Sequence, residues 1–210
     1  MWAWKQAHFD TAEARGEMLD FCEREGISHI DQHVIIHNNV ITNADALKCL
    51  IVEAAQRDIT VNALRGDKDM FLVDNYERTL HTIKALVAFN RTLPRGAKFL
   101  GLKFDVEPYL TLDWQAGVEQ RSRIIMEYLN CLTLIRAHLN THEHELELAV
   151  EVHFWWDNEE YVVQFEGSTE RFVHHIQNRV DWIGIMSYRR EANKIIRMVE
   201  DELLYASKHG

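Results

Sequence analysis

The stretch Gly101-Leu102-Lys103-Phe104-Asp105-Val106-Glu107-Pro108-Tyr109 runs through mostly apolar residues into two carboxylates two positions apart, and then into a proline. Side chains two positions apart on an extended chain point to the same face, so Asp105 and Glu107 are expected to lie side by side. Pro108 has no N–H to donate to a strand ladder and marks the end of the strand. The pair is therefore predicted at the carboxyl end of a strand, where α/β enzymes carry their chemistry.

Strand-like and helix-like segments alternate six times along the chain. Strands are predicted at 2–5, 27–36, 59–64, 99–106, 147–154 and 180–187, and helices at 10–25, 43–57, 74–90, 113–140, 172–178 and 193–207. Asp10 or Thr11 is expected to cap the first helix and Gly26 to end it, while Asn38 and Asn39 are expected to form a turn. Connections of this length suit parallel crossovers, so the sequence predicts an α/β fold with a parallel sheet.

The number of units distinguishes a barrel from an open sheet. A dinucleotide-binding sheet is expected to carry a G-x-G-x-x-G turn, and none occurs in the sequence. A (β/α)8 barrel has eight units over roughly 250 residues. We therefore expect residues 1–210 to form one TIM-barrel-like parallel (β/α) domain with six βα units, that is, an incomplete (β/α)8 barrel. The last two strands would be missing through truncation, or supplied by another segment. An open doubly wound sheet is the alternative.

Composition excludes some classes of partner. The chain has 23 Lys and Arg against 33 Asp and Glu, a net charge of -10, which argues against a nucleic-acid partner. No run of 18 apolar residues occurs, so no membrane span is expected. Cys22, Cys49 and Cys131 are expected to be small buried side chains in a reducing compartment, which favours a cytoplasmic protein. The chain starts within its first strand, so an upstream segment could precede it. An incomplete barrel also leaves an open strand edge, which an oligomer could cover.

Polar and aromatic side chains gather at the predicted carboxyl ends of the strands, which share one rim in a parallel barrel. Aromatic faces stack on the C–H faces of sugar rings, while charged groups address the hydroxyls and the glycosidic oxygen. The pattern indicates a carbohydrate site. Its substrate-binding residues are predicted to be Trp4, Gln32, Arg65, Asp67, Tyr109, His153, Trp155, Asp157 and Arg189.

Several of these residues also have a purely structural interpretation. Trp155 and Trp156 could pack in the core, Arg65 and Asp67 could form a salt bridge within a loop, and His153 could be a hydrogen-bonded strand residue. The carboxylate pair is different. Two carboxylates on one face repel each other and raise the pKa of one of them, a cost that structure alone rarely requires.

The string from Leu100 to Glu107 resembles the fourth-strand signature D-G-x-D-x-D-x-E of family-18 chitinases and related endo-N-acetylglucosaminidases, and residues 186–188 resemble their M-x-Y motif. The chain also looks like bacterial barrel proteins of glycoside-hydrolase type that share the runs F-x-G-x-x-x-D-V-E-P-Y and M-x-Y-R. The resemblance extends over all six predicted strands. It implies that Glu107 is the general acid, that Asp105 orients a substrate N-acetyl group as internal nucleophile, and that Tyr188 assists.

The sequence departs from the signature where Leu100, Lys103 and Arg189 stand in place of aspartates. Lys103 beside the pair is expected to hold both carboxylates ionised. Three functions stay open. The first is a glycoside-hydrolase-like protein that acts on a glycan without a cofactor. The second is a non-catalytic barrel that binds a carbohydrate or a protein through Trp4, Tyr109, Trp155 and Trp156. The third is a metal-dependent hydrolase with Asp67, Asp105, Glu107 and His153 as ligands, although no H-x-H or H-E-x-x-H spacing supports it.

Overall fold

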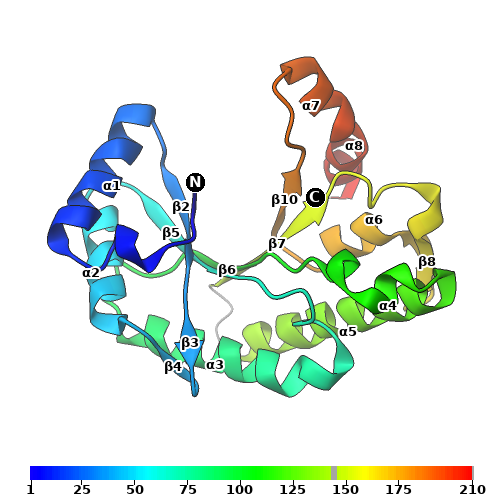
Figure 1. Ribbon diagram of the computed structural model, residues 1–210, viewed down its shortest axis with the longest axis horizontal. Helices are drawn as coiled ribbons and strands as arrows, with labels where there is room; N and C mark the ends of the chain where they lie inside the picture. Colours follow the sequence, from blue (N-terminus) through cyan, green and yellow to red (C-terminus); the bar gives the residue numbers. More distant parts are fainter. Residues whose placement is uncertain (143–145, 210) are drawn as a thin grey trace.

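A curled sheet of six parallel strands organises the molecule, in the order β1-β2-β5-β6-β7-β10. The computed structural model describes residues 1–142 and 146–209. Figure 1 shows the strands side by side in chain order, with the helices on the convex side of the sheet. The predicted incomplete TIM-barrel-like α/β fold is confirmed.

The elements follow in chain order. They are β1 (Trp2–Ala3), η1 (Gln6–His8), α1 (Ala12–Glu25), β2 (His29–His33), β3 (Ile36–His37), β4 (Val40–Ile41), α2 (Ala44–Ala55), β5 (Thr60–Arg65), η2 (Val73–Asn75), α3 (Tyr76–Thr92), β6 (Gly101–Phe104), η3 (Pro108–Leu110), α4 (Leu112–Gln115), α5 (Val118–His142), β7 (Glu147–His153), η4 (Glu159–Tyr161), β8 (Val162–Phe165), β9 (Ser168–Arg171), α6 (Phe172–Gln177), β10 (Trp182–Met186), α7 (Ala192–Met198) and α8 (Glu200–His209).

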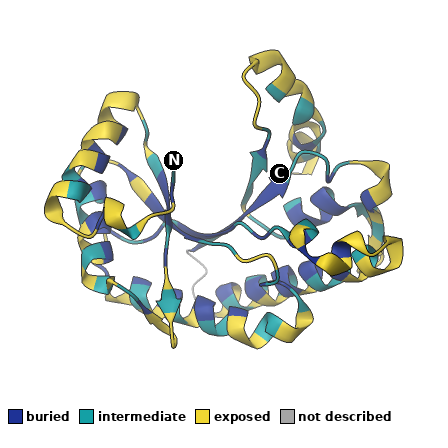
Figure 2. Ribbon diagram, viewed as in Figure 1, coloured by how far each residue is buried: buried dark blue, intermediate teal, exposed yellow. Residues whose placement is uncertain are grey.

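The hydrophobic core lies between the sheet and the helices. Leu102, Phe104 and Val106 alternate with Lys103 and Asp105 along the chain, and all three apolar side chains are buried in the core. Figure 2 shows the same division, with buried strands and with helices that expose their outer faces. Burial of each large apolar side chain contributes about 1.5–3 kcal/mol. The alternation therefore fixes β6 in the centre of the sheet and directs its polar residues to the concave side.

Two predicted helices are each divided in two. The stretch predicted at 113–140 is broken by Gly117, whose φ of 145° lies in a region that other residues rarely adopt, so α4 ends before it and α5 begins after it. The stretch predicted at 193–207 consists of α7 and α8. The first helix agrees with the prediction, because Thr11 caps α1 with a 3.1 Å bond from the Ala14 N–H and Gly26 ends it.

Two β-hairpins were not predicted. Asn38 and Asn39 form the expected turn, but with φ values of 49° and 62° they join β3 to β4 as a tight hairpin. β2 consequently ends at His33, before the predicted limit of 36. The second hairpin joins β8 to β9 through Glu166 and Gly167, both with positive φ.

The three cysteines were predicted to be buried, and no membrane-spanning segment was predicted. Cys22 and Cys131 are buried as predicted, whereas Cys49 is exposed, so the prediction of burial is wrong for that residue; all three thiols are free. Within 1–142 and 146–209, every helix is too short or too polar to cross a membrane.

Side chains from the two ends of the sheet meet across its concave side. The ring of Trp2 on β1 lies 6.0 Å from that of Tyr188, which follows β10, and the rings of His29 and Trp182 lie 5.7 Å apart. The Trp2 indole also donates to Glu151 on β7 at 3.1 Å. The concave side is therefore filled by side chains at this level.

Candidate active site

Asp105 and Glu107 follow the last residue of β6, at the carboxyl end of the central part of the sheet. Pro108 then starts the short η3 turn, which brings Tyr109 back so that its hydroxyl donates to Oε1 of Glu107. Both carboxylates are partly accessible, whereas Val106 between them is buried. Both residues directly follow β6, so the pair lies at the carboxyl end of a strand.

Residues of β7 and its following loop complete the surroundings of Glu107. His153 places Nε2 3.5 Å from the same oxygen, Oε1, that accepts from Tyr109. The His153 ring lies edge-on to Tyr109 at 4.4 Å and stacks on Trp155 at 5.0 Å. Burial lowers the pKa of His153, against the opposing effect of the Glu107 charge. An aromatic wall made by Tyr109, His153 and Trp155 thus stands beside Glu107.

Burial and neighbouring charges perturb the carboxyl of Asp105. Burial, followed by the charges of Glu107 and Glu151, raises its pKa to about 7. Its Oδ1 is buried and has no hydrogen-bond partner within 1–142 and 146–209. Asp105 therefore takes up a proton near neutral pH.

The expectation that Lys103 keeps both carboxylates ionised is wrong for Asp105. The Lys103 ammonium lies 2.8 Å from Oδ2 of Asp31 and forms a second ion pair with Glu151, and all three side chains are buried. Lys103 lowers the pKa of Asp105, but burial and the two glutamates outweigh it. The charge of Lys103 is thus paired with the buried carboxylates of Asp31 and Glu151 on the concave side.

This buried triad of Asp31, Lys103 and Glu151 was not among the predicted site residues. Glu151 lies over Gly184 of β10, where any Cβ would overlap its carboxylate. The alternation of side-chain direction along a strand could have predicted two members of the triad. Lys103 shares the face of Asp105, and Glu151 shares the face of His153.

Three other predicted residues follow the carboxyl ends of the two edge strands, β1 and β10. Tyr188 is 65% exposed, yet desolvation of its hydroxyl and the charges of Glu151, Asp105 and Glu107 raise its pKa to about 12. Arg189 lies over the ring of Phe154 and donates to the Tyr188 carbonyl at 2.9 Å. Trp4 is exposed, with its ring 5.2 Å from His33.

The side chains of Gln32 and Arg65 have partners other than the carboxylate pair. Gln32 is fully buried and donates to the carbonyls of Ala3 and His33, and Arg65 donates to the carbonyl of Val34 at 2.7 Å. Both were placed at the rim because they end a strand. Each stands one position from a concave-face residue, so its side chain points the other way.

Asp67, Asp157 and Trp156 have other surroundings as well. Asp67 pairs with Arg78 at 3.4 Å rather than with Arg65, so the predicted loop salt bridge has a different partner. Asp157 lies among charges of the C-terminal helix α8: burial first, and then Asp201, raise its pKa. Trp156 is fully buried in the core and offers no binding surface, which agrees with its structural interpretation.

The metal-dependent alternative required Asp67 together with Asp105, Glu107 and His153. Asp67 instead pairs with Arg78 on α3. In the described part of the chain, no three His, Cys, Asp or Glu side chains are arranged as a metal-ion site.

Asp105 is expected to make stability fall as pH rises from about 4 to about 7, because in this window the folded chain binds a proton that the unfolded chain has released. Asp105→Asn removes this proton uptake, so its melting temperature should exceed that of the native chain by a few degrees at pH 8 and by less at pH 5. Thermal denaturation from pH 4 to 8 measures this. The exposed Asp45→Asn serves as the matched control, and the same pH profile in Asp105→Asn as in the native chain would contradict the assignment.

The chain is similar in fold to several solved structures. A chitinase from Chromobacterium violaceum ATCC 12472 aligns with a TM-score of 0.56 and 14% identity, over 99% of this chain and 63% of that protein. The spore cortex-lytic enzyme SleL of Bacillus megaterium QM B1551 aligns with a TM-score of 0.60 and 12% identity, over 99% and 47%. The GH18 chitinase ChiB from Flavobacterium johnsoniae aligns with a TM-score of 0.53 and 12% identity, over 96% and 63%.

This chain spans between 47% and 63% of the length of these three proteins. No protein-family model matches the sequence, and no curated protein matches it. At such low identity the similarity is one of fold. The chain therefore has an incomplete TIM-barrel-like fold of the kind found in GH18 chitinases.

Proposed function

We propose that this chain is a glycoside-hydrolase-like protein that cleaves a glycan, with Glu107 as general acid and Asp105 as its partner. The observation that carries the proposal is the pair itself: two carboxyl groups at the carboxyl end of β6, one with a pKa of about 7 and the other beside an aromatic wall. A carboxyl whose pKa is shifted to near neutrality at a strand end marks an acid or base role. The fold shared with chitinases is consistent with this reaction class.

In the proposed reaction Glu107 donates its proton to the glycosidic oxygen as the bond to the leaving sugar breaks. The Tyr109 hydroxyl, which already donates to Glu107, stabilises the carboxylate that remains. Asp105 orients the N-acetyl group of the sugar, whose carbonyl oxygen attacks the anomeric carbon, and Tyr188 assists from the segment that follows β10. Trp155 and Tyr109 supply flat faces for the sugar rings.

A second candidate is a glycan-binding protein that does not cleave its ligand. It is favoured by the buried Lys103, which stands where the chitinase signature has an aspartate and is paired with Asp31 and Glu151. Trp4, Tyr109 and Trp155 would then be the contact residues, since Trp156 is buried.

A glycan panel separates the two candidates. The native chain is incubated with chitooligosaccharides of two to six sugars and with peptidoglycan fragments, and the products are identified by mass spectrometry. New reducing ends support hydrolysis. Saturable binding without products, seen by calorimetry on the same glycans, supports the binding protein. If the chain neither cleaves nor binds these glycans, both candidates lose their support.

A further inference from the structure

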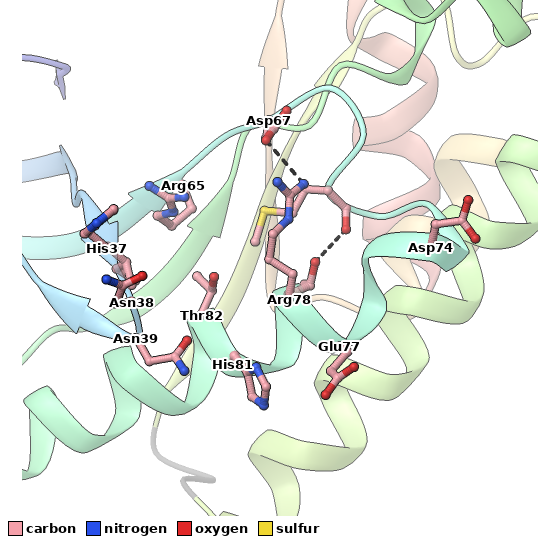
Figure 3. Close-up of a pocket in the computed structure, with 13 residues that line it drawn as sticks. His37, Asn38, Asn39, Arg65, Asp67, Asp74, Glu77, Arg78, His81 and Thr82 are labelled. Carbon is pink, nitrogen blue, oxygen red and sulfur yellow. Dashed lines mark hydrogen bonds and ion pairs between the residues drawn. The ribbon is translucent and has the colours of Figure 1, made fainter.

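A polar cavity of about 620 Å³ lies away from the carboxylate pair, between the β3–β4 hairpin, the loop after β5 and helix α3 (Figure 3). Its lining includes His37, Asn38, Asn39, Arg65 and Thr82. Arg65 ends β5 three positions after Asn62, which binds Asp31 of the triad, so strand alternation directs the two side chains to opposite sides of the sheet. The cavity is therefore separate from the candidate active site.

The guanidinium of Arg65 has unused hydrogen-bonding capacity beside this cavity. It carries five N–H donors, of which one on Nη1 binds the Val34 carbonyl at 2.7 Å. Its Nε is buried and has no partner among the residues that the structure describes. Burial lowers the pKa of Arg65, with the Asp67 charge acting against it, and no carboxylate within 1–142 and 146–209 forms an ion pair with it. Arg65 is only partly exposed, so its guanidinium is incompletely solvated and has no counter-charge of its own in the part of the chain that the structure describes.

The charges around Arg65 limit what that counter-charge can be. Arg78, the other guanidinium of the cavity, already pairs with Asp67 and Asp69. Asp74 and Glu77 add two carboxylates toward the α3 end of the cavity. Of the two guanidinium groups in the lining, that of Arg65 is the one without an ion pair among the described residues, and the other charged groups nearby are mainly carboxylates. Such a site suits a ligand with a single negative charge better than a phosphate dianion.

We infer that this cavity binds a small molecule through one carboxylate, held by the fork of the Arg65 guanidinium, with Asn38, Asn39 and Thr82 lining the space for the rest of the ligand. The planar fork matches the two oxygens of a carboxylate. The inference does not depend on the proposed glycan chemistry. In the described ranges these residues meet the carboxylate pair only through a backbone bond, from the Asp105 N–H to the Arg65 carbonyl at 2.7 Å, and no ion pair joins their side chains to Asp105 or Glu107.

The test follows the Arg65 Nε–H signal in ¹H–¹⁵N spectra of the full chain during titration with sodium acetate, at pH 7 and constant ionic strength kept with sodium chloride. The signal is assigned by its loss in Arg65→Lys. We expect a saturable shift with half-saturation below about 50 mM, and a rise in melting temperature that follows the same concentration dependence. Arg65→Lys should weaken acetate binding about tenfold or more, since lysine lacks the fork. The exposed Arg95→Lys is the matched control and should bind as the native chain does.

Several outcomes overturn the inference. An equal shift with chloride alone shows simple screening, tighter binding of inorganic phosphate than of acetate shows a phosphate site, and a shift that never saturates shows no site. If Arg65→Lys does not fold, selective ¹⁵N labelling of arginine and the native titrations with the three anions still decide the question.

Discussion

Glu107→Gln is expected to lower the rate of glycan cleavage by about 10²–10⁴-fold, the contribution that a positioned general acid usually makes. Glutamine keeps the size of the side chain and can still accept the hydrogen bond from Tyr109, but it has no acidic proton to give to the glycosidic oxygen. The measurement is kcat/KM on any glycan that the native chain cleaves. Because the hydrogen bond is kept, the melting temperature should change little, so the loss can be attributed to chemistry.

Glu17→Gln is the matched control for this variant. Glu17 is exposed in the middle of α1 and undergoes the same chemical change, so it should leave kcat/KM unchanged. Full activity of Glu107→Gln on every glycan that the native chain cleaves would show that another group donates the proton.

Lys103→Met is expected to destabilise the fold by about 3–5 kcal/mol at pH 7, because it leaves Asp31 and Glu151 as buried carboxylates without their cation. Against the effect of burial, hydrogen bonds from His29, Lys103 and Asn62 lower the pKa of Asp31 to about 2. This carboxylate stabilises the native chain above the unfolded pKa of about 3.9, and the contribution is lost as pH falls through about 2. Lys103 lowers the pKa of both Asp31 and Glu151, so in Lys103→Met both carboxylates take up protons at a higher pH than in the native chain. The cost of Lys103→Met should therefore shrink as pH falls from 7 to 4. Urea denaturation at pH 4 and pH 7 measures it.

Two comparisons make the Lys103 result specific. Lys84→Met changes an exposed lysine on α3 and should alter stability by no more than about 0.5 kcal/mol. Adding Asp31→Asn and Glu151→Gln to Lys103→Met removes the uncompensated charges and should recover part of the loss. A loss of equal size in all backgrounds would indicate a packing defect instead of an electrostatic one.

The parallel sheet was predictable because each strand is a short apolar run followed by a helix of the right length. The hairpins were not. Val162-Val163-Gln164-Phe165 and Ser168-Thr169-Glu170-Arg171 are short and partly polar, and they form a two-stranded sheet with each other. Their stability depends on packing against α6, which no local pattern reveals.

The candidate site was predicted best where strand alternation was applied. Asp105 and Glu107 were placed by their spacing, and His153 and Tyr109 lie beside them in the structure. Gln32 and Arg65 were chosen by nearness to a strand end alone, and one position along a strand reverses the face. The ion pair between Lys103 and Asp31 joins residues 72 positions apart, so only the curvature of the sheet brings them together.

The sequential strand order has a consequence for how the chain is made. β2, β5, β6, β7 and β10 each pair with the sheet strand that precedes them in the sequence, so the sheet can grow at one edge while synthesis proceeds. Contacts between distant residues are slower to form than local ones. Asp31 receives its cation only when β6 is added, and the charges of the concave side are complete only when β7 brings Glu151. A nascent chain that stops short of β7 therefore lacks one member of the buried triad, and its last strand is still an open edge.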